Sequence, residues 1–290
     1  MDYNTLTKDP DYYFPDGNIC IAVDQVLFRV TQSALARQST IFCDMLKLSE
    51  PTDGSESLEG AAVVRLSDGL DEIRTLFMFM HGDIPLKPSF DMIDRALRIS
   101  HKYEANRLYA WGLSHLRGYP NANSERPAYF GKKEYMDPDF LARLIQLTQL
   151  LDRRELDGHA ALAYYSLSTI NWKLHDPKPI FHQLDAETIS RLASGRSNIL
   201  PRCLNIINGI VKHRCMTEAT TKRPAREEER CQAEKDAVLD VLVPNVGGDF
   251  VTALSRCPAT GTCRLLASLI MKGLADIHGS IFADFGFSHT

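Results

Sequence analysis

Short apolar runs and polar breaks alternate along the first third of the chain, in an order that predicts a small sheet followed by helices. Residues 19–23 (Ile-Cys-Ile-Ala-Val) and 26–30 (Val-Leu-Phe-Arg-Val) are mostly apolar, and the polar pair Asp24-Gln25 separates them. Runs rich in Ile and Val favour strands, and a two-residue polar break between two such runs is typical of a β-hairpin. We therefore expect an antiparallel hairpin here.

Helical spacing follows the hairpin. Ser39 separates two short helical patterns, and its hydroxyl is suited to cap the second one by accepting from backbone N–H groups near Phe42. A third strand is expected at residues 62–66, and amphipathic helices are expected after it because apolar residues recur every three or four positions. The expected helices span residues 33–37, 41–46, 70–80, 90–103 and 106–116.

A change in composition ends this region. Residues 118–127 combine Gly, Pro, Asn and Ser, which break regular structure, so we place a domain boundary after residue 118. The rest of the chain shows only helical spacing. Helices are expected at residues 140–151 after a cap at Asp137, at 156–167, from a cap at Asp185 to a stop at Gly195, and from Pro201 to Val211.

The last part of the chain is also predicted to be helical. Within the charged residues 212–236, a mobile loop is expected to give way to the exposed start of a helix that ends at Pro244. Asp249 and Thr262 are expected to cap the last two helices. The apolar residues 281–287 are expected to dock on the helical core. The predicted fold class is therefore α+β, with a small sheet clad by helices in residues 1–118 and an all-α domain in residues 119–290.

Composition narrows the class of protein. The 290 residues are 44% hydrophobic and 24% charged, as in a globular protein, and the net charge of -4 weighs against nucleic acid as a partner. Residues 265–277 are interrupted by polar side chains, and the acidic N-terminus lacks the plan of a signal peptide, so we expect no membrane segment. We expect the seven cysteines to be reduced thiols in the cytoplasm or nucleus.

Several segments in this order resemble the BTB/POZ family of protein-interaction domains. Residues 28–42 are similar to its hairpin-to-helix signature, and residues 77–84 to the segment that ends its third helix. His101-Lys102-Tyr103, with Leu108 and Leu116, is similar to its fourth and fifth helices. Residues 12–18 (Tyr-Tyr-Phe-Pro-Asp-Gly-Asn) are similar to the lead-in of fungal members. The chain carries Asn18 and Thr31 where many members have Asp and His.

The resemblance implies a non-enzymatic protein–protein interaction module. Such modules act as dimerising scaffolds or as substrate adaptors that bind the cullin scaffold of a ubiquitin ligase. In cullin-binding members the end of the third helix and the fifth helix make the contact, which here corresponds to Met80, His81, Asp83 and Tyr109. Two alternatives remain: a transcriptional or chromatin scaffold that uses the domain without cullin, and a metal-dependent enzyme housed in the helical half.

The sequence contains no catalytic motif that would support the enzyme. It has no Gly-x-Ser-x-Gly, no His-Glu-x-x-His and no Gly-x-Gly-x-x-Gly pattern, so no cofactor is expected. Five late cysteines raise the question of a structural zinc ion. Their spacings do not include the close pairs that zinc sites use, which favours buried thiols over metal ligands. These residues are Cys203, Cys215, Cys231, Cys257 and Cys263.

Overall fold

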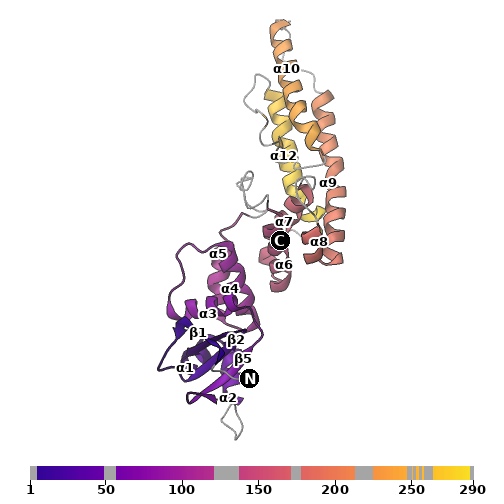
Figure 1. Cartoon of the computed structure of the whole chain (residues 1–290). Helices are drawn as coiled ribbons and strands as arrows, with labels where there is room; N and C mark the ends of the chain where they lie inside the picture. The colour runs from indigo at the N-terminus through magenta and orange to yellow at the C-terminus, as the bar shows by residue number, and fades with distance from the viewer. Residues whose placement is uncertain are drawn as a thin grey trace. The chain divides into compact units, whose positions relative to one another are not determined.

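The computed structural model divides the chain into two compact units, Met1–Tyr119 and Pro120–Thr290 (Figure 1). The first unit combines a sheet with helices, and the described elements of the second are all helical, so the chain is a mixed α+β protein. The residues that the structure describes are 5–48, 57–120, 137–170, 178–212, 225–246, 250, 253–254, 257 and 264–287.

The sheet of the first unit has five strands in the order β1-β3-β2-β5-β4. The predicted hairpin is confirmed: β2 pairs antiparallel with β3, and Val23 faces Val26 across the turn. The turn residue Asp24 adopts a left-handed backbone (φ 49°), a conformation that Asp tolerates better than most residues. The strands are β1 (Thr7–Tyr13), β2 (Ile19–Val23), β3 (Val26–Val30), β4 (Ser57–Leu58) and β5 (Ala61–Leu66).

Strand β1 was not expected from the sequence. It pairs parallel with β3 at one edge of the sheet, with an irregular register between Lys8 and Tyr13. Its sequence, Thr-Lys-Asp-Pro-Asp-Tyr-Tyr, contains a proline and three charges, which disfavour a strand by propensity. An edge strand tolerates both, because one row of its backbone groups needs no partner in the sheet.

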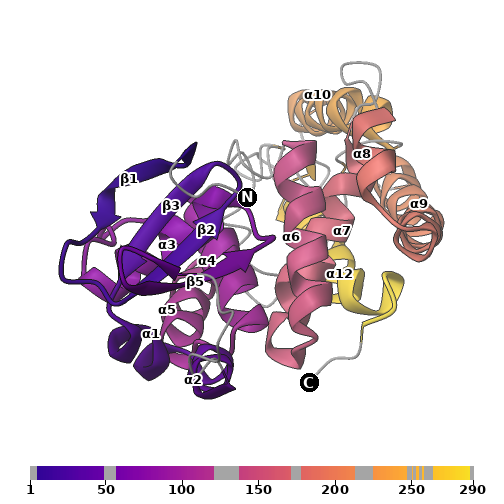
Figure 2. The same cartoon turned by 60° about the horizontal axis from the view of Figure 1, so that its bottom comes forward.

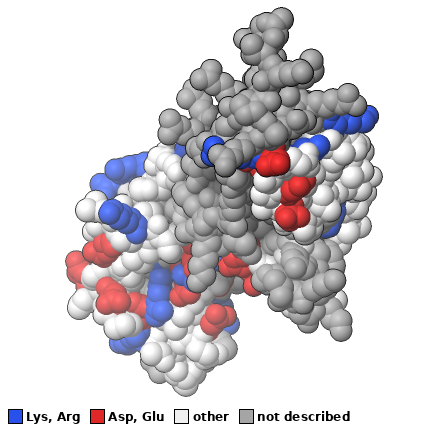
Figure 3. Space-filling model, turned by 90° about the horizontal axis from the view of Figure 1, so that it is seen from above, with Lys and Arg blue, Asp and Glu red and all other residues white. Residues whose placement is uncertain are grey.

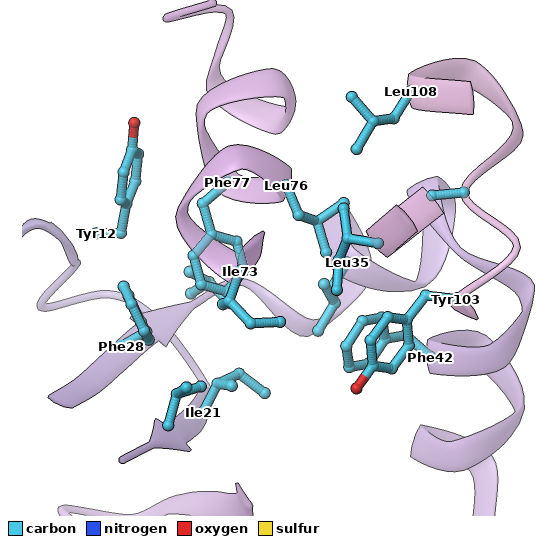
Figure 4. Close-up of a cluster of buried hydrophobic side chains, with 14 of the residues drawn as sticks. Tyr12, Ile21, Phe28, Leu35, Phe42, Ile73, Leu76, Phe77, Tyr103 and Leu108 are labelled. Atoms are coloured by element: carbon cyan, nitrogen blue, oxygen red, sulfur yellow. The ribbon is translucent and has the colours of Figure 1, made fainter. Parts of the chain in front are cut away.

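Five helices cover one face of the sheet, as predicted (Figure 2). Ser39 caps α2 as expected, because the Phe42 N–H donates to its Oγ (3.0 Å). The same Oγ donates to the Tyr103 carbonyl at the end of α4 (2.5 Å), and the Phe42 and Tyr103 rings stack (4.4 Å; Figure 4). The helices are α1 (Gln32–Gln38), α2 (Thr40–Leu48), α3 (Leu70–His81), α4 (Phe90–Lys102) and α5 (Asn106–Leu116).

Both faces of the central strands are buried. Along β2, Ile19, Ile21 and Val23 face the helices, whereas Cys20 and Ala22 belong to a second, smaller core on the other face. The sheet curls around this second core. Glu59, in the turn between β4 and β5, accepts from Lys8 Nζ and the Tyr13 hydroxyl of β1 (3.0 Å each), and from Arg29 of β3 (2.9 Å). Contacts across the curl therefore link the two edges of the sheet.

The second unit is built around α7. Every residue from Gly158 to Ser168 is buried, so this helix is enclosed on all sides, as is typical of a central helix. Asp137 caps α6 as predicted, accepting from the Asp139 N–H (3.0 Å). The helical elements are α6 (Pro138–Leu151), η3 (Arg154–Leu156), α7 (Asp157–Thr169), α8 (Lys178–Gln183), α9 (Ala186–Lys212), α10 (Ala225–Leu242), η4 (Val243–Asn245) and α12 (Arg264–Asp284).

One expectation for this unit was wrong. The stop at Gly195 and the new start at Pro201 do not occur, because α9 runs without interruption from Ala186 to Lys212. Gly195 has a packing role instead: a Cβ at this position would lie 2.1 Å from the ring of Phe285. The Phe285 side chain is buried there, and residues 281–285 dock on the helical core as expected. Asp249 and Thr262 lie outside the described residues.

Candidate functional site

The end of α3 positions three of the residues that the family resemblance indicates. Gly82 has a left-handed backbone (φ 80°), and the Asp83 N–H donates back to the Met78 carbonyl (2.8 Å). Glycine makes this kind of helix stop at little steric cost. The helix therefore ends sharply, with His81 and Asp83 exposed on either side of the glycine and Met80 half-buried against the core.

Aromatic residues from the end of β1 pack against this helix end. The His81 ring stacks on Tyr12 (5.6 Å between ring centroids) and contacts Phe14 (4.8 Å). The Tyr12 hydroxyl donates to Asp83 Oδ2 (3.2 Å), and Tyr12 lies at the edge of the main core beside Phe77 (Figure 4). We call Tyr12, Phe14, Met80, His81 and Asp83 the β1–α3 patch.

The patch has a defined protonation state at Tyr12. Burial raises the pKa of Tyr12 to about 12, with a further contribution from the hydrogen bond to Asp83. A raised pKa keeps the phenol neutral near pH 7, so its hydroxyl remains a hydrogen-bond donor. The Asp83 carboxylate is thereby held at one oxygen, whereas its other oxygen makes no hydrogen bond to the described residues.

A buried ion pair fixes β1 beside α3. The Asp9 side chain, 0% exposed, accepts from Nε and Nη2 of Arg74 on α3 (2.9 and 2.8 Å). It also accepts from the backbone N–H groups of Asp11 and Tyr12 (3.0 Å each). Hydrogen bonds between a guanidinium and a carboxylate are among the strongest in proteins. This ion pair therefore joins the strand that carries Tyr12 to the helix that ends at His81.

The fourth predicted residue, Tyr109, comes from α5, where it is half-buried. The contact between α3 and α5 is made elsewhere on that helix, by Trp111 against Phe79 (6.4 Å), and Trp111 also packs on His115 (4.7 Å). Tyr109 lies two positions before Trp111, which is about 200° around a helix. It therefore points to the opposite flank of α5 from the ring that meets α3.

The contributions of Tyr12, Phe14, Trp111 and His115 were missed by sequence reasoning. The run of aromatic residues at 12–14 was visible, but its strand was not predicted, so nothing placed these rings beside His81. A helical wheel of α5 could have separated Tyr109 from Trp111. The pairing of Trp111 with Phe79 depends on how two helices cross, which the sequence pattern does not fix.

A groove of about 290 Å³ lies beside α1 and α2, lined partly by Asn18, Gln32, Cys43 and Lys47. Asn18 has a structural task there, because its Oδ1 accepts from the Gln32 N–H (2.7 Å). This bond caps α1 from the neighbouring strand, since the residue before the helix, Thr31, makes no such side-chain bond. Position 18 thus keeps the acceptor oxygen that an Asp would supply, without the charge.

The helical unit contains an open polar cleft of about 370 Å³. Gln149 donates to Thr188 Oγ1 (2.8 Å) and to the Tyr164 hydroxyl (3.3 Å) at its base. Arg191 lies over the rings of Tyr164 and Phe287 (5.5 and 5.2 Å) and pairs with Glu187 (3.2 Å). Both aromatic rings that line the cleft, and one of its two arginines, are therefore in contact with other side chains of the protein.

The late cysteines are placed only in part. Cys203, Cys231 and Cys257 are buried, whereas Cys215 and Cys263 lie outside the described residues. Burial raises the pKa of Cys203 to about 12 and also raises the pKa of Cys257, which disfavours the thiolate that a metal needs. Within the described ranges, no group of three His, Cys, Asp or Glu side chains is arranged to hold a metal ion.

Comparison with known proteins adds no family. No family model matches the chain, and no curated protein is significantly similar to it. Among the helices that the structure describes, none combines the length and the apolar character needed to cross a membrane. We therefore base the functional proposal on the geometry of the β1–α3 patch, the groove and the cleft.

Proposed function

We propose that the first unit is a non-catalytic protein-docking domain of the BTB/POZ type, and that a partner binds at the β1–α3 patch. The observation that carries this proposal is the exposed helix end, where His81 packs on Tyr12 and Phe14. Rigid aromatic side chains at a surface provide large contact area at low entropic cost, which is why they are common in protein interfaces. The ion pair of Asp9 with Arg74 supplies that rigidity.

The loop that follows α3 extends this surface. Leu86 is 96% exposed, the largest value among the exposed large apolar residues, while Ile84 packs against the core. A leucine exposed to water gains from being covered by a partner, at about 25 cal/mol for each Å² of apolar surface removed from water. Pro85 and Pro88 flank Leu86 and limit the backbone freedom that binding must remove.

The sheet edges are poorer docking sites, which favours the helix end. Strand β1 carries Pro10 and three charged residues, and β4 is only two residues long. Prolines, charges and short strands protect an edge from pairing with another chain. On the face drawn in Figure 3, basic and acidic side chains are interspersed over the described residues, which supports a protein partner over nucleic acid.

The partner class that the family resemblance favours is a cullin-type scaffold, with the helical unit supporting that contact or presenting a substrate. Self-association through the groove at Asn18 and Cys43 is compatible with this role. A transcriptional or chromatin scaffold remains the alternative, because it would use the same domain with a different partner. The enzyme alternative has no comparable support in the described cleft.

The test mixes the purified chain with a purified cullin N-terminal domain and measures binding by interferometry, with light scattering for self-association. We expect binding that weakens at least about tenfold in the Phe14→Ala/His81→Ala double variant. Tyr109→Ala reports separately on the far flank of α5, and Asp44→Asn is the control, since Asp44 makes only an exposed pair with Lys47. Absence of cullin binding by the unaltered chain would favour the alternative scaffold. Binding that is indifferent to the double variant would exclude the patch.

A further inference from the structure

We infer that the partner segment which occupies the β1–α3 patch carries a basic side chain next to an apolar anchor. This inference rests on the proposed docking function and specifies the chemistry of what docks. It follows from two negative charges at the patch that make no ion pair within the described residues.

Two carboxylates at the patch lack a cationic partner. Asp83 is exposed and is held only by the Tyr12 hydroxyl, and Asp11 is exposed and makes no side-chain hydrogen bond or ion pair within the described residues. Asp11 directly precedes Tyr12 in β1, and Asp83 accepts from the Tyr12 hydroxyl, so both carboxylates belong to the junction between β1 and the end of α3. Asp9, the third carboxylate of this junction, is neutralised by Arg74.

The nearest cations in the sequence do not fill this role. Lys87 lies four residues after Asp83 but makes no ion pair within the part of the chain that the structure describes. Arg74 already donates two hydrogen bonds to the buried Asp9, so its guanidinium is committed. The rim of the patch therefore offers two negative charges beside exposed apolar surface, and the complement of such a surface is a cation beside an apolar side chain.

The aromatic rings of the patch determine which apolar side chain of a partner would fit. The half-buried Phe14 and the exposed His81 present ring surface at 4.8 Å from one another, and Leu86 stands free in the following loop. A large aliphatic or aromatic side chain fits against such surface. A Lys or Arg one helical turn or two strand positions away would then reach Asp83 Oδ1 or Asp11. We expect this pairing to supply orientation and association rate as well as affinity.

A random peptide library of about 12 residues, displayed on phage and selected against the full chain, tests the inference. We expect enriched peptides to combine Lys or Arg with a large apolar residue. Their affinity, measured by fluorescence polarisation, should fall about tenfold in the Asp11→Asn/Asp83→Asn variant, which keeps side-chain shape and removes both charges. Raising the salt concentration from about 0.05 M to 0.5 M should lower the peptide affinity of the unaltered chain by a similar factor. The same change should lower the affinity of the variant much less. Asp44→Asn serves as the matched charge control.

The outcomes separate this inference from the proposed function. Enriched peptides that lack basic residues, or that bind the Asn double variant unchanged, overturn the basic partner. If the same peptides still lose binding in Phe14→Ala/His81→Ala, the docking site itself stands. Peptides whose binding is unchanged in every variant of the patch would count against both the basic partner and the docking site. A selection that enriches no peptide would do the same.

Discussion

The two compact units use polar side chains differently. In the first unit, polar contacts join residues far apart in the sequence: Asp9 with Arg74, Ser39 with Tyr103, and Asp68 with Tyr103 (2.6 Å). The helical unit also has long-range polar contacts, such as Gln149 with Thr188 (2.8 Å) and Asn198 with the Asp284 carbonyl (3.1 Å). Several of its hydroxyl groups instead bond to a carbonyl three residues earlier on their own helix, as Thr148, Ser168 and Ser280 do. A curled sheet under five helices is linked by side chains that reach between elements, whereas the helical unit combines such links with a central helix, α7, that is buried on every side.

The largest loss of stability is expected when a large apolar side chain is removed from the helical unit. Phe285→Ala should lower the free energy of unfolding of that unit by about 3–5 kcal/mol, because a buried ring is lost from the site above Gly195. Urea unfolding followed by amide hydrogen exchange assigns the loss to a unit. An equal loss of protection in the first unit would show that the two units do not unfold separately.

A second substitution checks the mechanism of that effect. Gly195→Ala alone should destabilise the unit by about 1–3 kcal/mol, since its Cβ would collide with the Phe285 ring. In the Phe285→Ala background the collision partner is absent, so the same change should cost much less. Additive effects of the two substitutions would contradict the assigned contact.

The matching experiment in the first unit removes a polar link. Arg74→Ala leaves the buried Asp9 carboxylate without its cation and should destabilise this unit by about 3 kcal/mol. Hydrogen exchange should rise first in β1 and α3. Arg95→Ala is a suitable control, because its pair with Asp71 is exposed on both sides and should contribute little. Equal effects of the two variants would refute the special role of Asp9.

Loss of a helix cap in the first unit should have a smaller effect on stability. Ser39→Ala should cost about 1–2 kcal/mol, since Ser39 Oγ both caps α2 and donates to the Tyr103 carbonyl of α4. Ser89 is the matched control, because it caps α4 through the Met92 N–H alone (3.3 Å). Thermal unfolding should therefore show a smaller shift for Ser89→Ala. The reverse order would mean that the link to Tyr103 adds nothing.

The smallest expected effect is a pH dependence of the helical unit. The hydrogen bond from the Thr188 N–H lowers the pKa of Asp185. A carboxyl whose pKa is lower in the folded state adds stability above its unfolded pKa and loses that stability as the pH falls below about 4. Asp185→Ser keeps an uncharged cap. Compared by urea unfolding across this range, the variant should lose less stability on acidification than the unaltered chain, and parallel curves would contradict the assignment.

Much of the first unit could be predicted because its signals are local. The hairpin, the Ser39 cap and the helices up to residue 116 follow from turn residues and apolar spacing within a few positions. Strand β1 could not be predicted, since it exists through long-range contacts: parallel pairing with β3 and the Asp9–Arg74 ion pair. Tyr12 belongs to that strand and Phe14 follows it directly, so the sequence pattern showed these rings but did not place them beside His81.

The helical unit shows the opposite limit. Apolar spacing indicated helices, but local signals gave the wrong break within α9. Gly195 and Pro201 predicted a helix end and a new helix start, but the helix continues through both. Gly195 instead leaves room for the ring of Phe285, ninety residues later, to pack against α9. At the candidate site, helix-end residues Met80, His81 and Asp83 share one patch. Tyr109 was assigned by resemblance; it lies on the flank of α5 away from the contact between Trp111 and Phe79, and its role in binding stays a prediction.

The central claim is that a partner docks where β1 meets the end of α3, and hydrogen exchange of the chain with and without a bound partner tests it most directly. The account predicts slower exchange confined to residues 11–14 and 80–87, with the rest of the sheet unchanged. Protection confined to the helical unit, or to the groove beside α1 and α2, would contradict it.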